Sequence, residues 1–352
     1  MDDLGRFRCC MRFEPADRPP YWELLGAEPA TIERWHDEGL PADEYFDAYF
    51  DLDRADRVPI DDGLLPPFVE EVRGCTDGVV TRQDALGRVV RERAGRLVEV
   101  VSYPLATRAD LAALERRQDA RSPRRFPRRW TDYLRCAHGR DYPLGIEVVG
   151  PLGRLIDLAG PQRTAALMAE EPTLVHDALD AFTRFLIDLL RPTLAGVGDV
   201  DFVILREALY GEALTAEAFA EWLSARYRAI VQAITDHRVE TIIVVCRGDL
   251  RAVLGPLAEA GITALAPLTV AAGMDPLALR REHGQALALI GGIDARVLAQ
   301  DCEAIEREVT RTVPALTSVG GWIPSLDGPA PPDVPLDNYR YYWELVRDLI
   351  EG

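Results

Sequence analysis

The chain has 352 residues, a formal net charge of −18 at pH 7 and an apolar fraction of 48%. This length can bury one large core, and no apolar segment is long enough to cross a bilayer. The acidic charge disfavours nucleic-acid binding, which needs a basic surface, and the amino terminus lacks the apolar core of a signal peptide. We therefore expect a cytoplasmic protein with no nucleic-acid and no membrane partner.

All 40 basic residues are arginine, and this excludes several enzyme classes. Pyridoxal phosphate enzymes and Schiff-base aldolases need a lysine amine, and P-loop NTPases need the lysine of GxxxxGK. The six cysteines show no CxxC spacing, and a chain with a core of this size does not need disulfides. We interpret the cysteines as mostly buried thiols.

The first 40 residues predict two helices with a strand between them. A helical pattern covers Leu4–Phe13, an apolar run at Tyr21–Leu25 predicts a first strand, and Thr31–Gly39 has a helix start and a glycine stop. The predicted strand contains Glu23, and a carboxylate among apolar residues needs a partner. Glu23 is therefore either a pocket residue or one half of a structural ion pair.

The next hundred residues predict an antiparallel segment, a helical segment and a buried strand. Val79–Tyr103 alternates like β-structure, with Gly87 and Gly95 as turn points. Thr107–His138 returns to a helical pattern, and Asp141–Val149 is an apolar run of strand length. The antiparallel segment, around residues 79–103, therefore reads as an insertion into a larger α/β domain.

The second half of the chain is the most regular. A long amphipathic helix is predicted at Glu171–Leu194, and helical segments separate the strand-like runs that follow. These runs are Val200–Leu205, Thr241–Cys246, Ile262–Pro267, Ala286–Ile290 and Ala315–Val319. Strands that alternate with helices favour a parallel sheet, and with the strands of the first half they reach the eight of a (β/α)₈ TIM barrel. We predict one such domain over residues 1–352, with an open doubly wound sheet as the alternative.

Two glycine pairs mark the predicted ends of strands. The runs ALALIGGID and ALTSVGGWIPSLD each break at Gly-Gly, and Asp294 and Asp327 follow the breaks. A glycine pair at a strand end lets the backbone pass close to a ligand or to a neighbouring strand, and barrel enzymes keep their chemistry at this end of the sheet. The two aspartates are candidate catalytic residues, or they cap the next helices and tie down loops.

Several segments together resemble the uroporphyrinogen decarboxylase superfamily, in particular its branch near the corrinoid-linked methyltransferases. They are RPPYWELL, TIERWHDEGLP, PLTVAAGMDPLALRREHG, LALIGGIDARVLAQ and GGWIPSLDGPAPPDVPLDNYRYYWEL. The resemblance covers nearly the whole chain and implies a TIM barrel. It also implies one of two chemistries, which are cofactor-free decarboxylation and methyl transfer at a zinc-activated thiol.

The site motifs of both chemistries are altered in this chain. The decarboxylase motifs near the amino terminus are missing. The zinc ligands of the methyltransferases, a His-x-Cys pair and a later Cys, fall on Val245, Arg247 and Gly321. Cys246 is one position away, and in a strand this places it on the other face. We therefore interpret Cys246 as a structural thiol and expect no zinc and no other cofactor, although zinc stays possible.

Further departures from the branch remove acidic groups at the mouth of the barrel and add guanidinium groups. Arg206 and Glu207 replace an acid pair before Tyr210, and Arg247 replaces an acid after the fifth strand of the resembled barrel. Two arginines at strand ends would form a positive pocket for a carboxylate or phosphate. Arg206 could instead form a salt bridge with Glu207 or with a neighbouring helix.

The sequence thus favours a metal-independent decarboxylase or related lyase that acts on an anionic small molecule. Arg206 and Arg247 would bind its carboxylate, and Glu207, Asp294 or Asp327 would handle the proton. The other expected pocket residues are Trp22, Glu23, Tyr210 and Trp322, although Tyr210 and Trp322 could equally fill the core. The alternatives are a methyltransferase that works with a corrinoid protein, and a non-catalytic barrel that binds an anion. The resemblance also makes a homodimer possible.

Overall fold

The computed structural model describes residues 1–208 and 214–352, so Tyr210 lies outside the described residues. Its principal sheet is parallel and has seven strands in the order β1-β6-β7-β8-β9-β10-β11. The strands are β1 (Asp56–Arg57), β6 (Leu144–Val149), β7 (Phe202–Arg206), β8 (Thr241–Val245), β9 (Ala264–Ala266), β10 (Ala288–Ile290) and β11 (Trp322–Ile323). This sheet confirms the α/β class and the parallel pairing that the alternation of strands and helices predicts.

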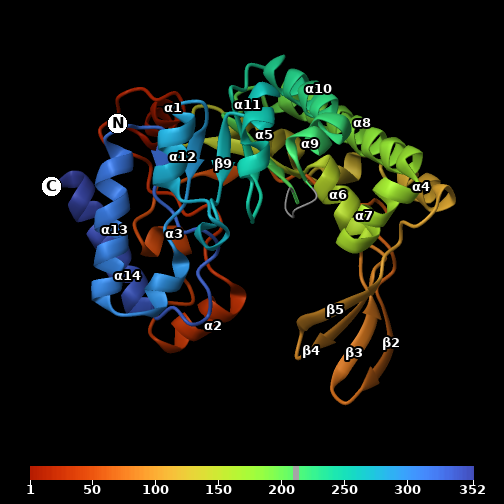
Figure 1. The fold of residues 1–352 in the computed structure, drawn as a ribbon, viewed down its shortest axis with the longest axis horizontal. Helices are drawn as coiled ribbons and strands as arrows, with labels where there is room; N and C mark the ends of the chain where they lie inside the picture. Colours follow the sequence, from red (N-terminus) through yellow and green to blue (C-terminus); the bar gives the residue numbers. More distant parts are fainter. Residues whose placement is uncertain (209–213) are drawn as a thin grey trace.

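Helices connect the strands and surround the sheet (Figure 1). The α-helices are α1 (Asp3–Met11), α2 (Pro29–Asp37), α3 (Phe46–Tyr49), α4 (Arg108–Glu115), α5 (Trp130–Ala137), α6 (Pro151–Ala159), α7 (Pro161–Glu170), α8 (Pro172–Val197), α9 (Ala216–Trp222), α10 (Ser224–Thr235), α11 (Leu254–Glu259), α12 (Pro276–His283), α13 (Cys302–Thr317) and α14 (Leu336–Glu351). Short 3-10 helices are η1 (Pro123–Arg125), η2 (Arg251–Val253), η3 (Val270–Ala272) and η4 (Ala295–Ala299). Within the described residues, none of these helices is long and apolar enough to cross a membrane.

Alternate side chains of the strands enter two separate cores. Phe202 and Ile204 of β7 belong to a small inner cluster that also draws residues from β8, β9, β10, β11 and α1. Because one small cluster collects residues from so many strands, it must lie on the concave side of the sheet. Val203 and Leu205 instead enter the outer core, which contains residues of the surrounding helices. Successive residues of a strand point to opposite faces, so this alternation assigns a face to the residues at each strand end.

The two edge strands, β1 and β11, are connected through the segment after Pro20 rather than by direct pairing. The Asp53 amide donates to the Tyr21 carbonyl on one side, and the Ala330 amide donates to the Gly26 carbonyl on the other. An isolated parallel bridge joins Ala27 to Ala330. The strand pairing shows a curved seven-stranded sheet. It does not show the eighth strand or the closure of the barrel that the sequence predicts.

Two of the predicted strands are wrong. Tyr21–Leu25 is not a strand of the sheet, because it forms no strand pairing and the chain bends at Leu24 and Leu25. Ala315–Val319 is the end of α13 and the turn after it, and the true strand β11 comes after Gly320-Gly321. A short apolar run does not distinguish a strand from the last turn of a buried helix. The glycine pair at residues 320–321 therefore precedes its strand, whereas Gly291-Gly292 follows β10.

The inserted segment forms a second, antiparallel sheet that projects from the body on the same side as α2 (Figure 1). Its strands pair in the order β2-β3-β4-β5. They are β2 (Glu71–Thr76), β3 (Val79–Gln83), β4 (Val89–Arg93) and β5 (Arg96–Ser102). The predicted turn glycines Gly87 and Gly95 both have positive φ values. The sequence interpretation missed β2, which has Gly74 in its interior.

Candidate functional site

Two arginines and one glutamate meet on the concave side of the sheet at the carboxyl ends of β1, β6 and β7. The Arg57 Nε lies 2.6 Å from one carboxylate oxygen of Glu147, and the Arg206 Nε lies 2.9 Å from the other. Arg206 continues the inward alternation of Phe202 and Ile204, and its side chain is 52% exposed. Glu147 therefore holds Arg206 toward the mouth of the sheet, where its remaining guanidinium donors face solvent.

Arg247 adds a third guanidinium to the same mouth. It lies two residues after Val245, which packs against the inner cluster, so alternation directs it to the concave side. Its Nη2 lies 3.9 Å from the position that a Cβ would occupy at Gly328, in the loop after β11. Arg247 is exposed, and within residues 1–208 and 214–352 it forms no ion pair. The mouth therefore carries the guanidinium groups of Arg57, Arg206 and Arg247, and Glu147 pairs with the first two of them.

Glu207, a predicted proton-handling residue, points to the other face of the sheet. Its carboxylate accepts hydrogen bonds from the Gly153 amide at 2.6 Å and from the Tyr227 hydroxyl at 2.9 Å. The contact with Gly153 caps the first turn of α6, where helix amide groups have no helical partner, and Tyr227 belongs to α10. Burial raises the pKa of Glu207 to about 7. Its position fixes α6 against β7, and a role in proton transfer stays a prediction.

Glu23 is also buried, and it joins the amino-terminal segment to the end of the chain. One oxygen accepts hydrogen bonds from the Ser325 hydroxyl and, at 2.8 Å, from the Leu326 amide. The other accepts from the Tyr339 hydroxyl at 3.2 Å. None of these partners is a cation, so the predicted alternative of an ion pair for Glu23 is wrong. Burial raises its pKa to about 7.

The two predicted aspartates organise loops at the mouth. Asp294 caps η4 through the Arg296 amide and pairs with the Arg296 side chain at 2.6 Å; these contacts lower its pKa. Asp327 accepts hydrogen bonds from the Val270 and Ala295 amides, both at 3.0 Å. It thereby ties together the loops after β9, β10 and β11, and burial raises its pKa. Asp294 therefore caps the helix that follows it, whereas Asp327 ties down loops and does not cap the following helix α14.

The two predicted pocket tryptophans lie on different faces of the sheet. Trp22 belongs to the inner cluster, where its ring lies 5.9 Å from that of Phe7 and 5.4 Å from that of Phe202. Trp322 belongs to the outer core, and its Nε1 donates to the Gly291 carbonyl at 2.9 Å. Trp322 is therefore a core residue, whereas Trp22 fills the inside of the sheet.

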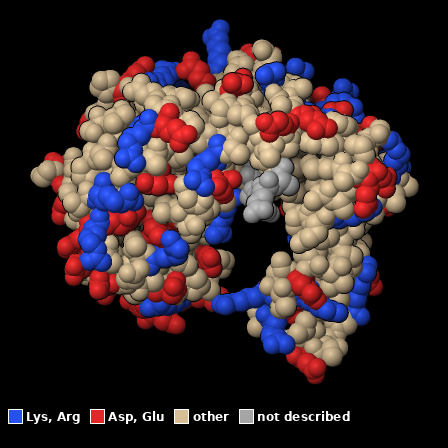
Figure 2. Space-filling view, in the orientation of Figure 1, with Lys and Arg blue, Asp and Glu red and all other residues tan. Residues whose placement is uncertain are grey.

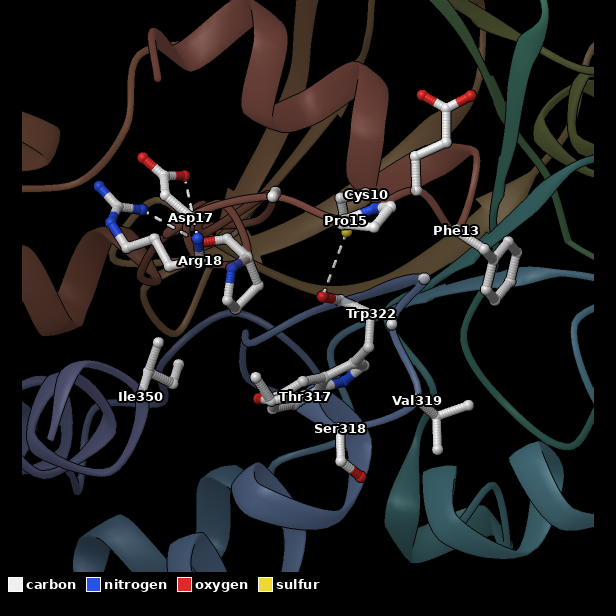
Figure 3. Close-up of a pocket in the computed structure, with 15 residues that line it drawn as sticks. Cys10, Phe13, Pro15, Asp17, Arg18, Thr317, Ser318, Val319, Trp322 and Ile350 are labelled. Atoms are coloured by element: carbon white, nitrogen blue, oxygen red, sulfur yellow. Dashed lines mark hydrogen bonds between the residues drawn. The ribbon is translucent and has the colours of Figure 1, made fainter.

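A cavity of about 330 Å³ lies beside the amino end of β11 (Figure 3). Arg57 and Arg206 lie instead at the carboxyl ends of their strands. Its walls come from the end of α1, from the chain after it and from the turn between α13 and β11, and they include Cys10, Phe13 and Val319. The Cys10 thiol donates to the Trp322 carbonyl at 3.4 Å, and burial raises the pKa of this thiol to about 12.

A family comparison identifies the chain. The model of the family described as "Uroporphyrinogen decarboxylase (URO-D)" matches residues 71–349. The chain belongs to the uroporphyrinogen decarboxylase family. A methyltransferase from Methanosarcina mazei has a similar structure, with a TM-score of 0.67, 15% identity and coverage of 99% of both chains. A B12-independent methionine synthase from Shewanella sp. W3-18-1 is also similar, with a TM-score of 0.38, 12% identity and coverage of 61% of this chain and 64% of the other. The search of curated proteins gave no match.

The resemblance to methyltransferases implies a set of zinc ligands, and the described residues of this chain do not supply such a set. No group of three or more His, Cys, Asp or Glu side chains in residues 1–208 and 214–352 has an arrangement that could hold a metal ion. Cys246 lies in the outer core, on the face opposite to Val245, as strand alternation predicts. Arg247 is a cation, and cations do not bind zinc. The donor set therefore does not fit a thiol-activating zinc centre.

The sequence interpretation missed two charged residues at the mouth and one on the neighbouring helix α6. Arg57 and Glu147 were not recognised, although Glu147 is the single acid in the apolar run LGIEVV, and that pattern was a usable signal. The third residue is Asp157 of α6. Burial raises its pKa, while the nearby Arg154, Arg88 and Arg206 partly offset this effect. No sequence pattern singles out Asp157, because its closeness to Arg206 depends on how α6 packs against β7.

Proposed function

We propose that this member of the uroporphyrinogen decarboxylase family is a lyase that decarboxylates a small anionic molecule without a metal. The observation that carries the proposal is the position of Arg206 and Arg247 at the mouth, where Arg206 is 52% exposed and Arg247 forms no ion pair within the described residues. Guanidinium groups bind carboxylates through paired, charge-assisted hydrogen bonds. The substrate class is therefore a carboxylic acid with at least two anionic groups, one of which anchors it while the other is lost.

The reaction breaks one carbon–carbon bond. Carbon dioxide leaves, its bonding electron pair stays on the substrate carbon, and a proton then forms a new C–H bond there. The substrate must itself delocalise that pair, for example into a carbonyl group or an unsaturated ring. Positive charge at the mouth stabilises the developing negative charge. The proton donor would be Asp327, which ties together the loops at the mouth near Arg247 and has a raised pKa.

The first prediction concerns anion affinity. Replacing Arg206 or Arg247 with alanine removes a charge-assisted contact, so each substitution should weaken binding of a dicarboxylate by about 10- to 100-fold. Isothermal titration calorimetry with a panel of di- and tricarboxylates measures this change. Arg307→Ala is the matched control, because that arginine is 66% exposed on α13. Equal affinity in both mouth variants and the control would refute the anion site.

The reaction itself is tested with the acids that bind. Incubation with carboxyl-labelled substrate should release labelled carbon dioxide, and deuterium from heavy water should appear at the carbon that lost it. Arg206→Ala should slow this release, whereas Arg307→Ala should not. A bound acid that is recovered unchanged would instead favour a barrel that binds an anion without catalysis.

Methyl transfer with a corrinoid protein is the second candidate. The full-length likeness to a protein described as a methyltransferase motivates it. The described residues lack a fitting set of zinc ligands, and this speaks against the thiol-activating form of the reaction. Metal analysis of the purified protein, together with a methyl-transfer assay using methylcobalamin and a thiol, distinguishes the two candidates. Stoichiometric zinc and thiol methylation would replace decarboxylation as the assigned activity.

A further inference from the structure

The cavity beside the amino end of β11 is formed by both ends of the chain. One wall is the end of α1 with the segment 13–19, and the other is the turn 317–321 between α13 and β11. Ile350, in the last turn of α14, closes one side. Figure 3 shows Phe13 and Val319 on opposite walls. The volume of about 330 Å³ is within the range of small-molecule sites in proteins.

Phe13 shapes one wall of the cavity with a strained backbone. Its φ is +58°, which is rare for a bulky residue. The ring packs on Gly321, where a Cβ would lie 2.0 Å from it. The Arg280 guanidinium lies 4.9 Å from the ring centroid and donates to the Gly321 carbonyl at 2.7 Å. Strained residues persist where their neighbours hold them, and they cluster at ligand sites. This wall is therefore in place before a ligand binds.

Apolar side chains line the cavity on both walls. They are Phe13, Pro15, Ala16, Pro19, Val319, Trp322 and Ile350. Val319 is 44% exposed, so an apolar ligand that excludes water from it gains free energy. The Cys10 thiol also lines the cavity, and it stays protonated at neutral pH because burial raises its pKa to about 12. The cavity therefore offers a largely apolar and uncharged interior.

Two of the three charged residues that border the cavity are already paired. Arg18 donates to both carboxylate oxygens of Asp53 at 2.7 Å. Asp17 accepts two hydrogen bonds from Arg6 at 3.0 Å and also pairs with the amino terminus. The third residue, Glu14, is exposed and forms no ion pair within the described part of the chain. A ligand carboxylate would thus enter the cavity without a free cation as its partner, and this costs free energy.

The charge of the whole molecule also disfavours a charged ligand. The chain carries −18, which repels anions. Figure 2 shows acidic and basic side chains interspersed over the visible face. A cation at the cavity could pair only with Glu14, and ion pairs with exposed carboxylates contribute little because water and salt screen them. A neutral ligand avoids both the repulsion and the loss of hydration.

We propose that this cavity is a second binding site, which takes a small, neutral and largely apolar molecule. The occupant contacts the end of α1, the turn after α13 and the last turn of α14, so it joins the two ends of the chain. Because it binds the folded state, it stabilises that state. The site does not depend on the proposed decarboxylation, because the arginines of the mouth lie at the carboxyl ends of their strands.

Indole and two charged analogues test the class of ligand. Indole is neutral, indole-3-acetate is an anion and tryptamine is a cation, and all three share one ring system. Isothermal titration calorimetry or ligand-observed NMR should show that indole binds at least about 10-fold more tightly than either analogue. Benzyl alcohol and cyclohexanol serve as further neutral probes. Failure of all three neutral probes to bind at millimolar concentration, or equal affinity for a charged analogue, would overturn the proposal.

Two variants that fill the cavity test its location. Val319→Trp fills it from the turn after α13, and Ile350→Trp fills it from α14. Each should weaken the binding of indole at least about 10-fold. Val72→Trp is the matched control, because it makes the same replacement at a valine that is 67% exposed on β2, and it should bind indole as the wild type does. Urea denaturation shows which variants are folded, and unchanged affinity in a folded filling variant would place indole elsewhere and refute the site.

Discussion

Replacing Gly291 with alanine is expected to destabilise the protein by about 3 kcal/mol or more. Gly291 directly follows β10 with φ +94°, and a Cβ at this position would lie 2.2 Å from the Pro267 carbonyl oxygen and 2.7 Å from that of Leu326. Both atoms belong to the backbone of neighbouring loops, so no side chain can rotate to make room. The overlap adds to the strain of a positive φ in a residue with a Cβ. Urea denaturation of the variant and the wild type measures the difference.

Gly320 provides the matched control for this experiment. It is also the first glycine of a pair and has a positive φ of +78°, but a Cβ there would meet nothing within 4 Å. Gly320→Ala should therefore cost only the backbone strain, about 1 kcal/mol. If the two variants lost the same stability, the close approach at Gly291 would not be the reason for this glycine.

The expected glycine contact is one of several features that local sequence patterns predicted correctly. The sequence placed a glycine pair after a buried strand, and the structure brings Gly291 against the loops after β9 and β11. The apolar runs of β6, β7 and β8 were also recognised, because strands buried on both faces are continuously apolar. Local composition was sufficient in these cases, since each element lies wholly within one uninterrupted run.

Elements that depend on tertiary contacts could not be predicted in this way. β1 has only two residues, and it is a strand because Asp56 and Arg57 pair with Leu144 and Gly145. β11 is equally short and is defined by its pairing with β10. Such strands have no periodicity of their own, so the sequence offers no pattern to detect.

The same distinction applies to the mouth. Arg206 and Arg247 were selected because they replace acids of the resembled family, and strand alternation places both on the concave side. The partner of Arg206 was expected to be Glu207 or a helix residue, yet it is Glu147. Glu207 is adjacent in sequence but points to the opposite face, whereas Glu147 is reached through the β6–β7 register, which pairs Val149 with Arg206. Register between distant strands is fixed by the assembled sheet, so sequence alone could not identify this ion pair.

The burial of Glu207 predicts a pH dependence of stability. In the folded chain its pKa is raised from 4.5 to about 7 because the carboxylate is buried without a cation. Below pH 4.5 the group is protonated in both the folded and the unfolded chain, so its contribution to stability is fully present. Between pH 4.5 and about 7, the carboxyl group of Glu207 ionises in the unfolded chain but stays largely protonated in the folded chain. The folded state should then lose about 3 kcal/mol relative to acidic conditions.

Glu207→Gln isolates this contribution. Glutamine keeps an oxygen for the Gly153 amide and offers an N–H to the Tyr227 oxygen, but it does not ionise. The stability of the variant minus that of the wild type should therefore rise by about 3 kcal/mol between pH 4.5 and pH 8, as measured by urea denaturation across this range. Glu303→Gln, at a side chain that is 79% exposed, should show no such rise. A difference that stays constant with pH would mean that Glu207 ionises in the folded protein as easily as in the unfolded chain.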